Sequence, residues 1–368
     1  MKIILACGGT GGHIFPAFSV AEELKSRFAG IEIIYVCGKK DIENEIFKIV
    51  TWERVVPIES APARMALSLS GVGFLIKLTR GFFRASALLR SEKPALVVGF
   101  GGHYSFPVVL AAKCLGIKTL IHEQNAKPGM ANKFLIRFVD AVALSYPETG
   151  NYLKPHSNVR VTGNPIRASI ESASRSKALK FFDFQPNKRT LLVLGGSQGA
   201  ESINSLFLGA LKFFPESLKA RVQVLHLCGK MAPGEVENLF KEFGIEGRAY
   251  SFFDRMDLAY ALTDVALGRA GATFLAEAAC KNIPVILIPY PFGDGHQREN
   301  AKIYGRERSA VILEQSDLDP ERLAKILIEQ INKDEKIMNI PLRLSASVNA
   351  RALLSDFIVD IANLNEQS

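Results

Sequence analysis

Two glycine-rich segments each follow a short apolar run and precede a stretch with helical periodicity. They read Gly8-Gly9-Thr10-Gly11-Gly12-His13 and Gly195-Gly196-Ser197-Gln198-Gly199-Ala200. Where a strand turns through glycines into a helix, the amides of the first helical turn and the helix dipole attract an anion. Both segments therefore predict phosphate-binding loops, with glycines that serve only a tight turn as the structural alternative.

The residues of the first segment exclude two common nucleotide-binding motifs. A dinucleotide fingerprint starting at Gly9 requires glycine at position 14, where Ile14 stands, and a P-loop requires Gly-Lys-Ser/Thr in place of Gly12-His13-Ile14. His13, at the end of the loop, is a candidate general base, and a structural hydrogen-bond donor is the alternative. In the second segment, the Ser197 hydroxyl either binds a phosphate or caps the helix.

A third segment with glycines, Gly268-Arg269-Ala270-Gly271-Ala272-Thr273, separates a predicted strand from a predicted helix over Phe274 to Cys280. Amides, a helix N-terminus and the Arg269 cation converge there in this prediction, which favours a diphosphate as the ligand. Glu277, one turn into the helix, is placed to accept hydrogen bonds from ribose hydroxyls. A solvated surface glutamate is the alternative.

Two clusters of polar side chains also follow predicted strands. His122-Glu123-Gln124-Asn125 is not a zinc motif, because HExxH requires histidine at position 126, where Ala126 stands. Its place at the carboxyl end of a strand, the ligand edge of an open α/β sheet, favours binding, with a turn stabilised by Asn125 as the alternative. The second cluster, Asp294 to Asn300, supplies polar side chains that suit sugar hydroxyls. Neither cluster indicates a metal ion, and no metal is expected.

Strands of a parallel sheet are needed to position these loops. Short apolar runs alternate with segments of helical period, which is the pattern of βαβ units. The predicted strands are Ile3 to Cys7, Ile31 to Cys37, Ala95 to Phe100, Lys118 to His122, Ala141 to Leu144, Thr190 to Leu194, Val222 to Leu227, Asp264 to Leu267, Val285 to Ile288 and Ala310 to Leu313. Each half of this series opens on a glycine turn, so we expect an α/β protein with two doubly wound domains.

The length of 368 residues suits two domains of ordinary size. Gly163-Asn164-Pro165-Ile166-Arg167, followed by a serine- and charge-rich stretch to Arg189, predicts a domain boundary at Gly163. The final segment, Ala346 to Leu364, has apolar residues at helical spacing and predicts a helix that packs on the rest of the chain.

Composition indicates an ordinary globular protein, with 48% hydrophobic and 22% charged residues, and excludes a disordered chain. Five cysteines, an odd number with no CxxC pair, indicate a reduced, intracellular location. The N-terminal apolar run reaches glycine too early for a signal peptide, and no apolar run approaches the ~18 residues of a membrane span. We therefore expect the chain to stay in the compartment where it is made.

Much of the net charge of +8 lies between Arg64 and Lys93, a segment with six basic residues and one acidic residue. Apolar side chains are interleaved with these cations: Phe74, Leu75, Leu78, Phe82 and Phe83. The composition predicts a basic amphipathic helix that attaches reversibly to an anionic membrane, at ~1 kcal/mol per basic residue. The alternative is a helix that buries its phenylalanines in the core. No nucleic-acid-binding motif is found, so no nucleic acid is expected as a partner.

Seven motifs, in order from Gly8 to about Ala301, together resemble one family. Besides the three segments with glycines and His122 to Asn125, they are Gly101-Gly102-His103-Tyr104-Ser105-Phe106-Pro107, Gly163 to Arg167, and His296-Gln297. The chain resembles the MurG family, bacterial UDP-N-acetylglucosamine:N-acetylmuramyl-(pentapeptide) pyrophosphoryl-undecaprenol N-acetylglucosamine transferases. That family commonly has tyrosine at the position of His103.

The resemblance implies a GT-B fold, in which two Rossmann-like doubly wound domains face each other across a cleft. It implies an N-terminal acceptor and membrane-facing domain of residues 1–163 with 346–368, and a UDP-GlcNAc-binding domain of residues 164–345. The implied reaction is inverting transfer of N-acetylglucosamine (GlcNAc) from UDP-GlcNAc to the C4 hydroxyl of the muramyl lipid (lipid I), which gives lipid II for peptidoglycan synthesis without a cofactor. The implied location is the cytoplasmic face of the bacterial inner membrane, with other cell-wall enzymes as candidate partners.

The same resemblance assigns roles to individual positions. His13 is the family's candidate base, and Thr10, Gly11, Gly12 and Asn125 approach donor and acceptor. The UDP-sugar is expected to be held by Arg167, Ser197, the backbone at Phe253, Arg269, Ala272, Thr273, Phe274, Leu275, Ala276, Glu277, His296 and Gln297. Inversion requires one base and a stabilised leaving diphosphate, with no covalent intermediate and no obligatory metal.

Other functions stay open at this point. One is a different GT-B enzyme, such as a UDP-GlcNAc 2-epimerase or a glycosyltransferase with another lipid acceptor. A second is a non-catalytic, membrane-attached subunit that binds a sugar nucleotide, although glycine loops in both halves of one chain argue against it. A third is an NAD oxidoreductase. The absence of the dinucleotide-binding fingerprint at the first glycine segment argues against it.

Overall fold

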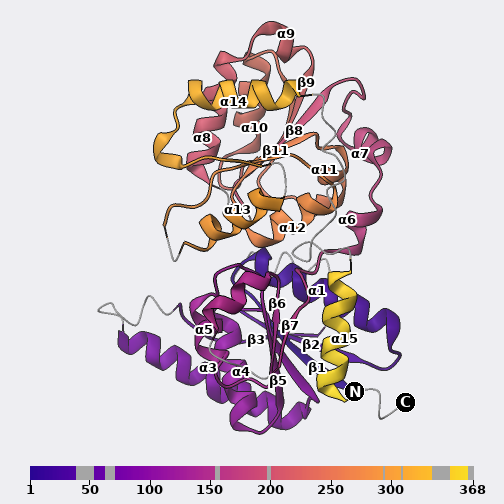
Figure 1. Ribbon diagram of the computed structural model, residues 1–368, viewed down its shortest axis with the longest axis vertical. Coiled ribbons are helices and arrows are strands. Elements are labelled where there is room, and N and C mark those ends of the chain that lie inside the picture. Colours follow the sequence, from indigo (N-terminus) through magenta and orange to yellow (C-terminus); the bar gives the residue numbers. More distant parts are fainter. Residues whose placement is uncertain are drawn as a thin grey trace. The chain divides into compact units, whose positions relative to one another are not determined.

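The structure, a computed structural model, describes residues 1–38, 54–62, 71–153, 158–196, 200–292, 295–307, 310–333 and 349–363. The chain divides into two compact units. Unit 1 comprises Met1–Arg167 with Arg343–Ser368, and unit 2 comprises Ala168–Leu342. The boundary thus falls at Arg167, compared with Gly163 in the prediction, and each unit contains one parallel sheet (Figure 1).

The sheet of unit 1 has seven strands in the order β3-β2-β1-β4-β5-β6-β7. Every neighbouring pair is parallel, and the central strands are buried along nearly their whole length, as expected when helices cover both faces. The strands are β1 (Lys2–Ala6), β2 (Glu32–Cys37), β3 (Arg54–Pro57), β4 (Leu96–Gly99), β5 (Lys118–Glu123), β6 (Ala141–Leu144) and β7 (Val159–Val161).

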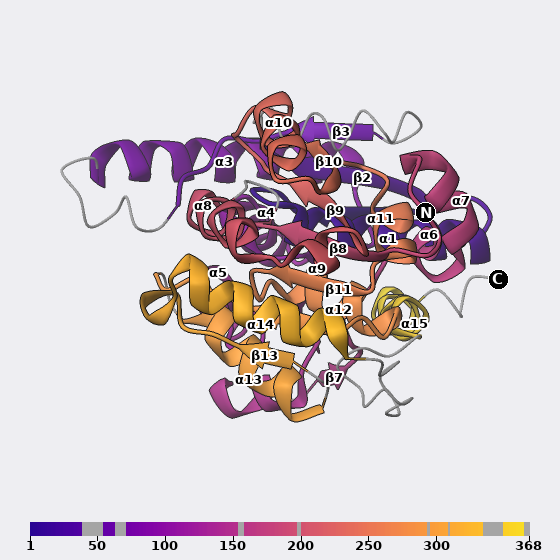
Figure 2. The same ribbon diagram turned by 90° about the horizontal axis from the view of Figure 1, so that it is seen from above.

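Helices cover the two faces of this sheet in different groups. α3 (Gly71–Glu92), α4 (Gly102–Cys114) and α5 (Met130–Leu135) pack on the face that includes Ile4, Ile34 and Val97. On the sheet's other side, α1 (Gly11–Arg27) lies beside α15 (Ala350–Ala362), and α15 also contacts β4, β5 and β6 (Figures 1 and 2). The C-terminal helix therefore completes unit 1, although it follows unit 2 in sequence. A short η2 turn spans Pro147–Tyr152.

The sheet of unit 2 has six parallel strands in the order β10-β9-β8-β11-β12-β13. They are β8 (Arg189–Leu194), β9 (Val222–Leu227), β10 (Glu246–Tyr250), β11 (Val265–Gly268), β12 (Val285–Leu287) and β13 (Ala310–Ile312). Its helical elements are α6 (Ala168–Ser172), α7 (Arg175–Phe182), α8 (Glu201–Ala210), η3 (Leu211–Phe213), α9 (Glu216–Lys219), α10 (Pro233–Glu242), α11 (Met256–Leu262), α12 (Ala272–Cys280), α13 (His296–Glu307), η4 (Gln315–Asp317) and α14 (Pro320–Asn332).

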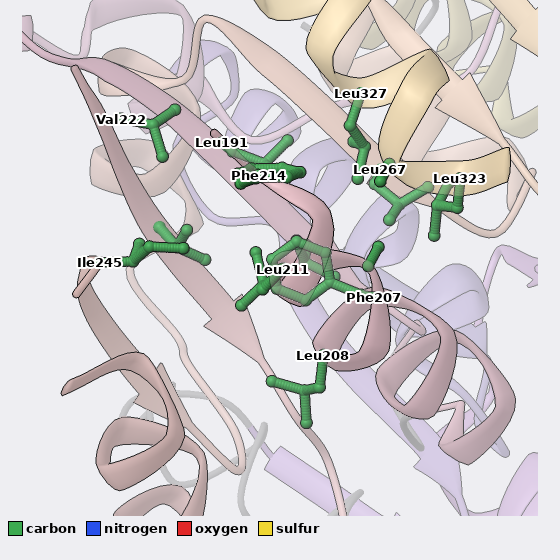
Figure 3. Packing of buried hydrophobic residues seen from close by; sticks show 14 of the residues in the cluster. Leu191, Phe207, Leu208, Leu211, Phe214, Val222, Ile245, Leu267, Leu323 and Leu327 are labelled. Atoms are coloured by element: carbon green, nitrogen blue, oxygen red, sulfur yellow. The ribbon is translucent and has the colours of Figure 1, made fainter. Parts of the chain in front are cut away.

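The core of unit 2 is formed by alternate residues of the central strands and by helices that include α8, α10 and α14. Leu191 and Leu267 from the sheet pack with Phe207 of α8 and with Leu323 and Leu327 of α14 (Figure 3). All five side chains are fully buried. Burial of a leucine or phenylalanine side chain contributes ~1.5 to 3 kcal/mol, so this apolar layer holds the sheet and its loops in place.

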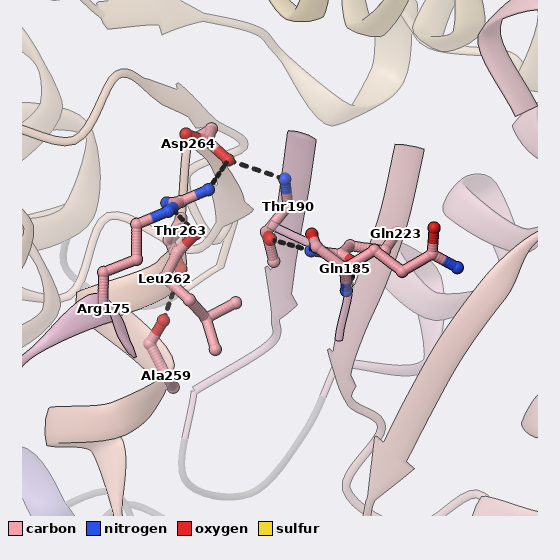
Figure 4. A network of polar contacts seen from close by, with 8 residues as sticks. All are labelled: Arg175, Gln185, Thr190, Gln223, Ala259, Leu262, Thr263 and Asp264. Atoms are coloured by element: carbon pink, nitrogen blue, oxygen red, sulfur yellow. Dashed lines mark hydrogen bonds and ion pairs between the residues drawn. The ribbon is translucent and has the colours of Figure 1, made fainter. Parts of the chain in front are cut away.

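A polar network fixes the amino-terminal edge of the same sheet. The Asp264 carboxylate, just before β11, accepts hydrogen bonds from the Arg175 guanidinium at 3.0 Å and from the Thr190 amide at 2.7 Å (Figure 4). Gln223 of β9 donates to the Thr190 hydroxyl at 2.9 Å and to the Gln185 carbonyl oxygen at 3.1 Å. The network joins α7 to the starts of three strands, at the edge opposite to the one where an α/β sheet binds ligands.

All ten predicted strands are found, and no boundary differs from the prediction by more than one residue. Three strands are missing from the prediction: β3, β7 and β10, each at an edge of its sheet. The stretch from Arg167 to Arg189, rich in serine and charge, contains α6 and α7. The predicted C-terminal helix is present as α15 within the described part of the chain.

Among the described residues, no cluster of three or more histidine, cysteine or acidic side chains has the arrangement of a metal site. Within those same residues, no helix is both long enough and apolar enough to span a membrane.

Candidate active site

Both sheets have a point where the chain changes its direction of winding. In unit 1 this point lies between β1 and β4, and in unit 2 between β8 and β11. Ligands of doubly wound sheets bind outside the carboxyl ends of the strands at this switch point. The segments at Gly8, Gly101, Gly195 and Gly268 lie at the carboxyl ends of these four strands, so the predicted loops lie where the topology favours a ligand.

His13 is held in one orientation at the unit 1 switch point. It is the third residue of α1, and its Nδ1 lies 3.1 Å from the Gly8 carbonyl oxygen and 3.3 Å from the Thr10 hydroxyl. Because a carbonyl oxygen only accepts, Nδ1 donates in that contact, and in the neutral ring Nε2 is then the accepting nitrogen. The glycine loop thus selects the tautomer that a base acting through Nε2 requires.

The loop after β4 lies directly against the His13 ring. Gly101 and Gly102 have φ of +83° and +74°, a region that favours glycine. A Cβ on Gly101 would lie 3.4 Å from His13 Nε2, and one on Gly102 would lie 2.7 Å from the Gly8 carbonyl oxygen. The absence of side chains at these two positions therefore allows the start of α4 to approach the imidazole.

The cluster after β5 is mainly structural. Glu123, 1% exposed, accepts from the amides of Asn125 and Gly129 at 2.9 and 3.0 Å and from the Asn132 side chain at 2.9 Å. Gln124, 2% exposed, donates to the Phe100 carbonyl oxygen at 2.9 Å.

The expectation that all four polar side chains of this cluster bind a ligand is wrong for the first three. His122, Glu123 and Gln124 are buried and hold the loops after β4 and β5 together, while Asn125 is half-buried at the sheet edge. The Asn125 side-chain amide donates to Glu123 at 3.1 Å, as in the turn-stabilising alternative.

Two buried histidines, one in each unit, are kept neutral. Nε2 of His122 lies 3.0 Å from the Gly163 carbonyl oxygen, and Nε2 of His226 lies 2.9 Å from Asn204 Oδ1. Burial lowers the pKa of each ring to about 4. In an unfolded chain the same groups titrate near pH 6.5, so between these values the unfolded state binds more protons than the folded state.

We expect acid to destabilise both units in this window. Stability contributed by the two neutral rings is complete above pH ~6.5 and falls as the pH drops toward 4, by up to ~1.4 kcal/mol per histidine per pH unit. Thermal unfolding measured between pH 7 and 4.5 tests this. His226→Gln, which keeps a donor for Asn204, should make the dependence shallower, and an unchanged slope in that variant would contradict the assignment.

In unit 2, the first turn of α12 supplies amides at the end of the loop after β11. The helix begins at Ala272 with Gly271 as its N-cap, two residues before the predicted start at Phe274. Ala272, Thr273 and Phe274 therefore occupy the positions whose amides have no carbonyl partner within the helix. Leu275 and Ala276, also assigned to the UDP-sugar, follow in the same helix and are buried.

The Arg269 guanidinium is buried and forms hydrogen bonds within unit 2. It is 7% exposed, and its two terminal nitrogens donate to Ile288 O, Pro289 O, Ser202 Oγ and Gln315 Oε1 at distances of 2.8 to 3.2 Å. Four of the five guanidinium donors thus have protein acceptors. Through these bonds Arg269 ties the loop after β11 to β12, α8 and η4, and its expected contact with the diphosphate stays a prediction.

Other predicted donor-site residues lie on the same edge of unit 2. Gln297, in the first turn of α13, accepts from the Tyr290 amide through Oε1 at 2.9 Å, so its side-chain NH₂ is the group available for donation elsewhere. His296 is the first residue of that helix, and both residues are partly exposed. Phe253 is buried after β10 and packs against Tyr250, with ring centroids 4.7 Å apart.

Glu277 is 4% exposed on α12, and its Oε2 accepts from the Tyr260 hydroxyl at 2.9 Å. The solvated-glutamate alternative is therefore wrong. Arg167 belongs to unit 1, where its guanidinium lies over the Phe15 ring, 4.2 Å from the centroid. Ser197 lies outside the described residues.

Several residues that build these loops carry no signal in the sequence. Tyr260, Ser202 and Asn132 lie on helices and act on groups far away in sequence. Asn300 of α13 donates to the Ala270 carbonyl oxygen at 3.1 Å and so holds the loop before α12. Only Asn300 falls within a polar cluster that the sequence had singled out.

Comparison with known proteins decides the family. The N-terminal domain of glycosyltransferase family 28 matches residues 3–144, and the C-terminal domain of that family matches residues 190–350. A UDP-N-acetylglucosamine–N-acetylmuramyl-(pentapeptide) pyrophosphoryl-undecaprenol N-acetylglucosamine transferase of Halothermothrix orenii is 39% identical, over 92% of each chain. The same-named protein of Desulforamulus reducens is 34% identical over 97% of each. The chain belongs to the MurG family of glycosyltransferases.

Solved structures agree with membership in the MurG family. Acinetobacter baumannii MurG is similar with a TM-score of 0.71 and 27% identity, covering 98% of this chain and 99% of that one. A UDP-GlcNAc 2-epimerase of Neisseria meningitidis, with a TM-score of 0.68 and 13% identity, shares the fold. The predicted GT-B fold class, with two Rossmann-like α/β domains, is confirmed.

Proposed function

We propose that this chain transfers GlcNAc from UDP-GlcNAc to the C4 hydroxyl of the muramyl lipid, forming lipid II and UDP. The observation that carries the proposal is membership in the MurG family over nearly the whole chain, with a glycine-lined switch point in each unit. In the reaction, the C4 oxygen attacks the anomeric carbon of GlcNAc and the bond to the diphosphate breaks. The configuration inverts, and the hydroxyl proton passes to a base.

Unit 2 is the donor side of this proposal. Amides of Ala272, Thr273 and Phe274 and the positive end of α12 stabilise charge that develops on the departing diphosphate, an interaction that strengthens in the transition state, while Leu275 and Ala276 continue this helix beside the UDP-sugar. Glu277 accepts hydrogen bonds from the ribose hydroxyls, and the backbone at Phe253 contacts the uracil of UDP. Gln297 donates through its NH₂ group to a sugar hydroxyl, and His296 lies beside it. Family resemblance adds Ser197 and Arg167 as further expected contacts of the UDP-sugar.

Unit 1 supplies the acceptor side. His13 Nε2 takes the proton of the C4 hydroxyl, since the Gly8 carbonyl oxygen fixes the tautomer from the other side of the ring. Thr10, Gly11 and Gly12 belong to the glycine loop, which the diphosphate and the sugar of the acceptor approach. Asn125, at the same sheet edge, contacts substrate through its side chain. A base of this kind contributes about 10² to 10⁴ in rate.

In this proposal the chain is a peripheral enzyme at the cytoplasmic face of the inner membrane, and α3 is the segment that attaches it to the lipid. Val72, Leu75, Ile76 and Phe83 of this helix are 73%, 61%, 46% and 66% exposed. Leu75, Ile76 and Phe83 also line a hollow of about 790 Å³, together with Arg80, Arg84 and Glu59. Exposed apolar side chains among cations suit an anionic lipid surface.

Phe82 behaves differently from Phe83, because it is half-buried and packs against the core of unit 1. The core-helix alternative is thus correct for Phe82. Leu78 is also half-buried, and Arg64 lies outside the described residues. The membrane-facing side chains of α3 are therefore the exposed ones.

We expect Leu75→Ser with Phe83→Ser to weaken binding to vesicles of phosphatidylglycerol and phosphatidylcholine at least ~5-fold, because two exposed apolar contacts are lost. Co-sedimentation measures the partition. The matched control is Phe213→Ser with Ile312→Ser, two residues of unit 2 that are 49% and 40% exposed. Transfer to a short-chain soluble acceptor should persist in both variants. Equal vesicle binding by the α3 variant and the wild type would refute attachment through α3.

The transfer itself is tested with the purified full chain, radiolabelled UDP-GlcNAc and a lipid I analogue, with UDP-GalNAc as the control donor. Donor-selective formation of the disaccharide lipid supports the proposal. UDP-GlcNAc binding without product would refute it, in favour of another acceptor, an epimerase or a subunit that requires a partner. Release of a 2-epimeric sugar in the absence of acceptor would identify the epimerase.

A further inference from the structure

A buried tyrosine holds the carboxylate that the proposed function assigns to the ribose. Tyr260 of α11 is 2% exposed, and its hydroxyl donates to Oε2 of Glu277 at 2.9 Å. Its ring lies nearly parallel to that of Phe274, at an interplanar angle of 25° and a centroid distance of 6.4 Å. Phe274 is in the first turn of α12, so Tyr260 contacts both the start of the donor helix and its carboxylate.

The helix that carries Tyr260 is itself anchored. At its carboxyl end, the Leu262 carbonyl oxygen accepts from Arg175 at 2.7 Å, and the Thr263 hydroxyl donates to the Ala259 carbonyl oxygen at 2.7 Å (Figure 4). Arg175 in turn pairs with Asp264 at 3.0 Å. These contacts connect α11 to the polar network at the opposite edge of the sheet. The phenol is therefore presented by a fixed element.

We propose that Tyr260 is a positioning residue for recognition of the nucleotide ribose, acting through Glu277. The inference rests on the proposed function, in which Glu277 accepts from ribose hydroxyls. A glutamate side chain loses rotamer freedom when it is fixed. A phenol that already binds one carboxylate oxygen fixes the side chain before the ligand arrives, so less of that cost falls on binding.

The hydrogen bond from Tyr260 also explains how the Glu277 carboxylate can be stable while nearly buried. A nearly buried carboxylate requires hydrogen-bond donors, and a hydrogen bond to a charged group is stronger than one between neutral groups. Loss of the phenol hydroxyl leaves Oε2 without this donor and allows the carboxylate to rotate. The contact with the ribose should then weaken, while contacts with the uracil and the phosphates are retained.

The experiment compares UDP, 2′-deoxy-UDP and 3′-deoxy-UDP by calorimetric titration of the full-length chain. We expect wild type to bind UDP at least ~10-fold more tightly than the analogue that lacks the recognised hydroxyl, since hydrogen bonds to charged groups have this magnitude. Tyr260→Phe should reduce that preference to about threefold or less, and Glu277→Gln should abolish it. In the double variant, Tyr260→Phe should have no additional effect.

The preference is a ratio of two affinities measured on one preparation, so a smaller folded fraction does not change it. Tyr35→Phe removes a phenol that is 1% exposed in unit 1, and it should keep the wild-type preference. A preference lost in Glu277→Gln but retained in Tyr260→Phe would overturn the inference and leave the proposed function intact. Equal weakening for all three nucleotides would also overturn it, as a purely structural effect. Failure of wild type to bind UDP at all would instead refute the proposed function.

Discussion

Replacement of His13 by alanine is expected to lower turnover of GlcNAc transfer at least ~100-fold and to leave the KM for UDP-GlcNAc close to its wild-type value. The ring is held by the glycine loop of unit 1, and its Nδ1 is engaged by the Gly8 carbonyl oxygen. The remaining nitrogen is the acceptor, which is the role of a base toward the C4 hydroxyl. Because the donor is assigned to unit 2, its affinity should not depend on this imidazole.

Steady-state kinetics with a lipid I analogue, together with calorimetric UDP binding, measure both quantities. His103→Ala is the informative comparison, since His103 is the second residue of the neighbouring helix α4, with its ring centroid 4.0 Å from that of Tyr104. A loss of turnover below threefold on replacing His13, or a larger loss on replacing His103, would remove His13 from the role of base.

The central strands of both sheets could be predicted from sequence because helices cover them on both faces. A strand such as β8, buried over five of its six residues, appears as a continuous apolar run between turn residues. The three missed strands are edge strands and lack this signal. β10 reads Glu-Gly-Arg-Ala-Tyr and is mostly half-buried, and β3 and β7 are partly or largely exposed. Their place in the sheet is decided by pairing with a neighbour, which no local pattern reports.

The positions of the glycine loops were predictable for the same topological reason, but the uses of individual side chains were not. Arg269 and Glu123 are the kind of charged residue that suggests a ligand contact in sequence. In the structure each is buried, and its hydrogen bonds are made to backbone and side chains of the protein. Whether a charged group faces ligand or protein depends on acceptors more than 40 residues away for Arg269, such as Ser202 and Gln315.

The residues that position other side chains of the site could not be predicted from the sequence. In the sequence Tyr260 is an aromatic residue of a short, mostly apolar helix. Its function follows from the 2.9 Å hydrogen bond that its hydroxyl donates to Glu277 on the next helix. Gly102 is similar, since its importance lies in a contact across the switch point with the loop after β1. In both cases the sequence identifies the group that is held, Glu277 or the His13 loop, and the fold identifies the residue that holds it.

Gly102→Ala is expected to reduce turnover at least ~30-fold, because a 1 Å displacement of a catalytic group can cost ~100-fold. The new Cβ would lie 2.7 Å from the Gly8 carbonyl oxygen and 3.2 Å from His13 Nδ1, so this loop and its imidazole must move. The variant also carries the strain of φ +74°. Gly116→Ala is the matched control, with φ +71° at the other end of α4 and no atom within 4 Å of its Cβ. Both variants should lose similar stability in thermal unfolding from backbone strain, and only Gly102→Ala should also lose turnover, with UDP affinity unchanged. Similar turnover in the two variants would mean that the contact between Gly102 and the His13 loop does not position the base.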